Sequence, residues 1–199
     1  MMKLFKLLSV SALLFGAVTV ASAQESNAES MKVSYGIKGG VNFATLNGAA
    51  PVSPDSRTNF NAGVFVELPV AQIFSVQVEA LYSGQGAELY SDNVKSKLAL
   101  DYINVPVLAK FYIVKGLSIE AGPQFSFLLN DEVTVEGNTS PSPYRGNLKT
   151  FEFGVSGGLT FQTSSGVFAQ ARYNQGITDV IDGLNAQNSV FQLGIGYKF

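Results

Sequence analysis

The sequence predicts an all-β fold: an eight-stranded antiparallel up-and-down transmembrane β-barrel, preceded by a cleavable signal peptide. Three observations lead to this prediction. Eight segments alternate between apolar and polar residues with a period of two, which is typical of strands with two different faces. Ionisable residues are almost confined to one of these faces, and the connections between segments are alternately short and long.

The N-terminal residues have the pattern of a secretory signal peptide. Lys3 and Lys6 form a positively charged start, an apolar run follows, and Ala21, Ser22 and Ala23 form a small-residue cleavage site. We therefore expect three parts of the chain: a signal peptide at 1–23, a polar periplasmic leader at 24–33 and an outer-membrane barrel domain at 34–199.

The composition narrows the chemistry that the chain can perform. The sequence contains no histidine and no cysteine, which excludes His-dependent nucleophiles, His- or Cys-ligated metals and disulfides. We therefore expect no enzyme activity, no cofactor and no bound metal. The formal net charge of −2 gives no basic excess for nucleic acid, and we expect no such partner.

The first four predicted strands each begin their apolar face with an aromatic or β-branched residue. They are expected at residues 34–43, 60–68, 74–86 and 99–113. The leading apolar residues are, in order, Tyr35, Phe60, Phe74 and Ile103. The last four strands are expected at 117–129, 150–161, 167–176 and 190–199. Their leading apolar residues are Leu117, Phe151, Val167 and Phe191.

Two prolines fall inside predicted strands. Pro106 and Pro123 each remove a backbone donor, and a closed barrel has no free edge at which to place them. We expect a bulge or a gap in the hydrogen-bond ladder there.

The polar faces of the eight strands carry eight charged residues in equal numbers of each sign. They are Lys38, Glu67, Glu79, Lys110, Glu120, Glu152, Arg172 and Lys198. A soluble barrel that holds an apolar ligand would have to bury these charges or expose its aromatic residues to water. A transmembrane barrel instead turns the apolar face to lipid. We expect the charges to form an ion-pair network that fills the lumen, with Lys110 opposite Glu120.

The connections support a membrane orientation. Three short turns alternate with four longer polar stretches, at 44–59, 88–97, 130–149 and 177–189. Short periplasmic turns and longer external loops are the arrangement of outer-membrane barrels.

Four motifs resemble the outer-membrane β-barrel domain family, often labelled "porin family protein", of Bacteroidetes-type Gram-negative bacteria. They are YINVPVLAKFY at 102–112, EAGPQ at 120–124, ARYNQGITD at 171–179 and the closing VFQLGIGYKF. The resemblance implies a barrel similar to the OmpA and OmpX type, embedded in outer-membrane lipid. It also implies a C-terminal signal read by the barrel-assembly machinery, made by Phe191, Leu193, Ile195, Tyr197 and Phe199.

Two functions fit this barrel. In the first, the lumen is filled by side chains and the protein has a structural or surface-interaction role through its four external loops. In the second, the barrel is a narrow porin-like channel for small solutes or ions. Eight strands enclose an interior that side chains can fill, which favours the first. We expect a monomer, and the loops contain no motif that identifies a partner.

Overall fold

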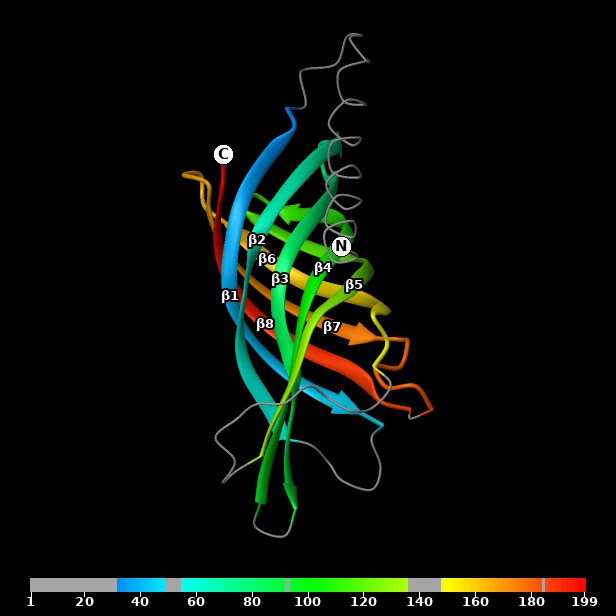
Figure 1. Cartoon of the computed structure of the whole chain (residues 1–199). Coiled ribbons are helices and arrows are strands. Elements are labelled where there is room, and N and C mark those ends of the chain that lie inside the picture. Colours follow the sequence, from blue (N-terminus) through cyan, green and yellow to red (C-terminus); the bar gives the residue numbers. More distant parts are fainter. Residues whose placement is uncertain (1–31, 49–54, 92–93, 136–147, 184) are drawn as a thin grey trace, which may run out of the picture. The chain divides into compact units, whose positions relative to one another are not determined.

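The computed structural model describes residues 32–48, 55–91, 94–135, 148–183 and 185–199. The predicted signal peptide and nearly all of the predicted leader lie outside the described residues. Residues 32–199 form a closed barrel of eight antiparallel strands in sequence order (Figure 1). The strands are β1 (Ser34–Asn47), β2 (Asp55–Ala71), β3 (Phe74–Ser91), β4 (Val94–Val114), β5 (Leu117–Val135), β6 (Phe151–Gln162), β7 (Val167–Gly176) and β8 (Gln187–Lys198).

The barrel closes between the first and last strands. β1 pairs with β8 from Gly36↔Lys198 to Asn47↔Gln187, and every other strand pairs with its neighbours in sequence. The backbone of Phe199 continues the seam by donating to the Tyr35 carbonyl at 2.8 Å. The predicted eight-stranded up-and-down barrel is therefore confirmed.

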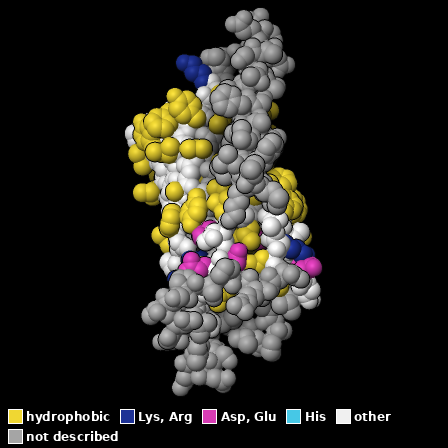
Figure 2. Space-filling view, in the orientation of Figure 1, with side chains coloured by type: hydrophobic (Ala, Val, Ile, Leu, Met, Phe, Trp, Pro, Cys, Tyr) yellow, Lys and Arg dark blue, Asp and Glu magenta, His cyan; other side chains and the backbone are white. Residues whose placement is uncertain are grey.

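The two faces of the wall have opposite character. Large apolar side chains point outward, and Ile195 is 70% exposed. Ionisable side chains point inward, and Arg172 is 1% exposed. Figure 2 shows the apolar side chains spread over the outer wall, with charged side chains gathered toward its ends. This polarity is the reverse of a water-soluble domain and is that of a wall bounded by hydrocarbon.

No helix in the described part of the chain is long and apolar enough to cross a membrane.

Several strands are longer than the sequence predicts. β3, β4 and β5 have 18, 21 and 19 residues, whereas a tilted strand crosses a bilayer in about 9–11 residues. Most of the stretch at 88–97, predicted as a loop, is strand on both sides of residues 92–93. In Figure 1 these strands reach furthest at the end where β1 finishes. A strand outside the membrane needs no apolar outer face, so the alternation that predicts strands is lost there.

The expected ladder gap occurs at the prolines. Between β4 and β5 the pairs Pro106↔Gln124 and Ala109↔Ala121 share one register, but the two positions between them are unpaired. The β3–β4 ladder has a similar interruption beside Pro106. The register is unchanged across both gaps, so each proline removes local bonds without shifting the strands.

Candidate functional site: the charged lumen

The lumen contains a central layer of ion pairs, formed by side chains from four strands. Arg172 of β7 contacts both carboxylate oxygens of Glu79 of β3, at 2.7 Å each. It also donates from Nη2 and Nε to Glu120 of β5, at 2.6 and 2.9 Å. Lys38 of β1 donates to Glu79 at 3.0 Å. Two cations thus balance two carboxylates, and the side chains of Lys38, Glu79, Arg172 and Glu120 are at most 2% exposed.

Neutral polar side chains add further donors to these two carboxylates. Gln170 donates to Glu120 at 2.8 Å, and Thr160 donates to its other oxygen at 3.1 Å. Gln77 donates to Glu79 at 2.6 Å. Each buried carboxylate therefore has several donors, which buried charges require in a low-dielectric interior.

Glycines on neighbouring strands make room for the long charged side chains. Lys38 lies opposite Gly63 of β2 and Gly196 of β8, and Arg172 lies opposite Gly158 of β6. A Cβ atom added at Gly158 would lie 3.0 Å from Arg172 Cα and 2.6 Å from the Ala171 carbonyl oxygen. Gly63, Gly158 and Gly196 therefore lie opposite the two long cationic side chains of the central layer.

A second ion-pair cluster lies nearer the short turns, which are on the periplasmic side in outer-membrane barrels. We call it the periplasmic cluster. Glu67 of β2 accepts from Lys110 of β4 and Lys198 of β8, at 3.2 Å each, and from the hydroxyl of Tyr112. Lys110 also donates to Gln77 at 3.1 Å, which connects this periplasmic cluster to the central layer.

Lys110 does not pair with Glu120. The two residues are opposite each other in the β4–β5 ladder, as the sequence predicts. This predicted register is therefore confirmed, but the side chains bond elsewhere: in the described structure Lys110 bonds to Glu67, and Glu120 bonds to Arg172. Side chains in a small barrel reach across the lumen, so partners from distant strands compete with the cross-strand neighbour.

Aromatic rings fill part of the lumen between these two charged groups. Phe65 and Phe168 both point inward and meet edge to face, with centroids 5.6 Å apart. Their rings occupy the space where a Cβ atom of Gly36 or Gly196 would lie. The alternation of the sequence does not reveal this pair, because both residues lie at polar-face positions. The facing glycines are the signal that could have found it.

Toward the external end, the lumen is first polar and then apolar. Asn42 accepts from Asn61 at 2.6 Å and from Gln192 at 2.9 Å, and donates to Ser83 at 2.9 Å. Beyond these amides is an apolar cluster that we call the external cap. Its buried members are Leu46, Ala87, Leu98, Leu100, Tyr102 and Val180.

Glu152 is the exception among the predicted lumen charges. Its carboxylate is buried and accepts from Asn188 Nδ2 at 3.0 and 2.9 Å and from the Tyr102 hydroxyl. Among the described residues no lysine or arginine bonds to it, so its expected place in an ion-pair network is wrong. Glu152 is on β6, the strand next to Arg172 on β7. The β6 residue opposite Arg172 is Gly158, however, and not Glu152.

The residues of the expected C-terminal signal all face outward. Phe191, Leu193, Ile195, Tyr197 and Phe199 are each at least 40% exposed. Recognition by the assembly machinery stays a prediction.

The carboxylates of the described lumen were compared with what a catalytic site or a metal site with several acidic ligands requires. No group of three or more acidic, histidine or cysteine side chains that could hold a metal ion occurs among the residues that the structure describes. The central carboxylates are engaged by arginine, lysine and amide donors, as in a structural ion-pair network. The absence of an enzyme activity stays a prediction.

Comparison with known proteins agrees with this architecture. Ail, the attachment invasion locus protein of Yersinia pestis, is 14% identical, with a TM-score of 0.52 over 85% of this chain and all of that one. Neisserial surface protein A is also 14% identical, with a TM-score of 0.54 over 84% of this chain and 99% of that one. Comparison with curated protein sequences gives no significant match. The model of the family described as "Outer membrane protein beta-barrel domain" matches residues 22–182. The chain belongs to this family and is an outer-membrane β-barrel protein.

Proposed function

We propose that the barrel has a closed, side-chain-filled lumen and serves a structural or surface-interaction role through its external loops. The observation that carries this proposal is the central layer. Lys38, Glu79, Arg172 and Glu120 come from strands around the wall and meet at hydrogen-bond distances. A solute on the barrel axis would have to separate these contacts.

Opening this layer is energetically costly. Removing one partner from a buried ion pair typically costs about 3–5 kcal/mol, because the remaining charge is left uncompensated. Arg172 holds two carboxylates at once, so moving it away leaves Glu120 without a cationic contact and Glu79 with Lys38 alone.

The external cap supports the same proposal. Tyr102, Leu100 and Val180 are fully buried at the external end of the lumen, and they exclude water there. A path through the barrel would therefore have to cross an apolar plug in addition to the ion pairs. With the interior occupied, the surfaces left for recognition are the external connections.

Planar-bilayer conductance tests this proposal against the narrow-channel alternative. The native protein is expected to be silent. A variant that opens both barriers, with Lys38→Ala and Arg172→Ala in the central layer and Leu100→Ala and Tyr102→Ala in the external cap, is expected to conduct. The matched control carries Lys110→Ala and Lys198→Ala, which removes two lumen cations from the periplasmic cluster but leaves the central layer intact. It is expected to stay silent.

The outcomes separate the two functions. Discrete current steps from the native protein would overturn the filled-lumen proposal and favour a channel for small solutes or ions. Silence from the native protein and the control, with conductance from the variant in which both barriers are opened, would support the proposal.

A further inference from the structure

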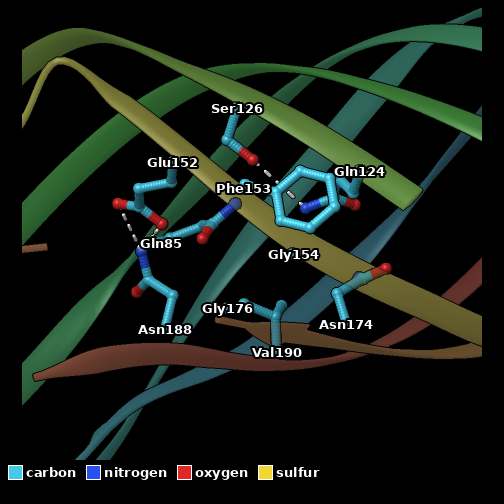
Figure 3. A pocket seen from close by; sticks show the side chains of 10 residues that line it. All are labelled: Gln85, Gln124, Ser126, Glu152, Phe153, Gly154, Asn174, Gly176, Asn188 and Val190. Atoms are coloured by element: carbon cyan, nitrogen blue, oxygen red, sulfur yellow. Dashed lines mark hydrogen bonds between the residues drawn. The ribbon is translucent and has the colours of Figure 1, made fainter. Parts of the chain in front are cut away.

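A small cavity lined by both polar and apolar residues lies in the external half of the lumen. Its volume is about 10 Å³, which is about the space that one water molecule or one small ion occupies. Six polar side chains contribute to its lining (Figure 3): Gln85, Gln124, Ser126, Glu152, Asn174 and Asn188. These polar groups line part of the cavity and can contact a single small occupant.

Glu152 gives this cavity an uncompensated negative charge. The carboxylate is 3% exposed, and its bonding partners among the described residues are the neutral groups of Tyr102 and Asn188. The other three lumen glutamates, in contrast, each contact lysine or arginine. A buried carboxylate without a counter-charge is costly, so a cation at this point would be stabilising.

Neutral oxygen ligands are present beside the carboxylate. Asn188 turns its amide nitrogen to Glu152, and its buried Oδ1 has no hydrogen-bond partner in the described structure. Gln85 donates from Nε2 to Ser83 at 3.1 Å, which leaves its own amide oxygen as an acceptor beside the cavity. Figure 3 shows Gln85, Glu152 and Asn188 grouped on one side of the cavity. Carboxylate and amide oxygens are the ligands that hard cations prefer.

We propose that this cavity binds one monovalent metal cation of the Na⁺ or K⁺ class, held by Glu152 with the amide oxygens of Asn188 and Gln85. The charge count favours a monovalent ion. One positive charge neutralises Glu152, whereas a divalent ion would leave an excess charge in a low-dielectric interior. The described residues also lack the cluster of acidic ligands that a divalent ion would use.

Equilibrium unfolding of the full protein in different salts tests the proposal. Urea unfolding is followed in NaCl, KCl or choline chloride at equal ionic strength, because choline is too large for the cavity. A cation that binds only the folded state lowers the unfolding constant. When the cation concentration is above the dissociation constant of the site, the unfolding constant falls almost tenfold for each tenfold rise in cation concentration. This dependence is expected with Na⁺ or K⁺ replacing choline.

Two variants separate this site from general ionic effects. Glu152→Gln keeps the shape but removes the charge, and is expected to lose the dependence on cation type. Glu67→Gln removes a lumen carboxylate that already has two lysines, and is expected to keep it. Identical unfolding of the native protein in all three salts would overturn the proposal, and so would a dependence that survives in Glu152→Gln.

A measurement on the native protein does not depend on any variant folding. Crystals soaked in thallium(I), a heavy substitute for K⁺, are expected to show anomalous density in the cavity beside Glu152. Anomalous maps without density at this position, together with salt-independent unfolding, would mean that Glu152 is neutralised by a proton.

Discussion

Replacement of Arg172 by alanine is the most informative test of the central layer, because its effect follows from charge counting. The native layer has two cations and two carboxylates in contact. Without Arg172, Lys38 alone faces Glu79 and Glu120, and the layer acquires one uncompensated negative charge. Four charge-assisted hydrogen bonds of 2.6–2.9 Å are lost as well. We expect the free energy of unfolding to fall by about 3–5 kcal/mol.

A second substitution distinguishes lost charge balance from lost packing. Adding Glu120→Gln to Arg172→Ala restores neutrality, since Lys38 then balances Glu79. We expect the double variant to recover roughly half or more of the lost stability, as strong coupling between contacting groups implies. The matched control adds Glu67→Gln to Arg172→Ala. It removes a carboxylate from the periplasmic cluster and is expected to recover nothing.

The lack of tryptophan determines how unfolding of these variants is measured. The chain contains no tryptophan, so equilibrium urea unfolding of the protein in lipid vesicles is followed by far-UV circular dichroism. If the losses in Arg172→Ala and Glu120→Gln simply add in the double variant, the charge-balance reasoning is refuted. A control that recovers as much as the double variant would refute it too.

Two further predictions concern packing in the lumen. Gly158→Val is expected to destabilise the barrel by about 1–3 kcal/mol through overpacking, because the new Cβ would lie 2.6 Å from the carbonyl oxygen of Ala171 on β7. Alanine at the neighbouring Gly157, where the nearest atom is 3.9 Å away, should be tolerated; equal losses in urea unfolding would contradict this. Phe65→Ala is expected to cost about 3–5 kcal/mol by leaving a cavity against Phe168. Phe60→Ala on the exposed outer face should cost less, and the reverse order would show that Phe65 is not packed as described.

Within the membrane wall the sequence predicted the strands well. The first residues of β1, β3, β5 and β7 agree with the structure, because there each strand separates hydrocarbon from a polar lumen and alternation is strict. The external ends were predicted too short. Ser96 and Lys97 are both polar and so break the apolar alternation, although β3, β4 and β5 continue past them as paired strands.

The contents of the lumen were predicted less completely. The eight charged positions point inward, but the sequence could not choose their partners, since period-two alternation fixes only the face on which a residue lies. It also did not anticipate inward apolar residues such as Phe65, Leu100 and Phe168. A polar face tolerates these residues where glycines or the external cap accommodate them.

The sequence by itself determined the membrane barrel, its number of strands and the face that the eight predicted lumen charges occupy, because these depend on local alternation and on the free energy of placing charge in hydrocarbon. The tertiary structure alone decided that Arg172 joins Glu79 to Glu120, that Lys110 bonds to Glu67, and that Glu152 has no cationic partner among the described residues. Those contacts depend on how strands far apart in the sequence curve around one lumen and bring their side chains within reach.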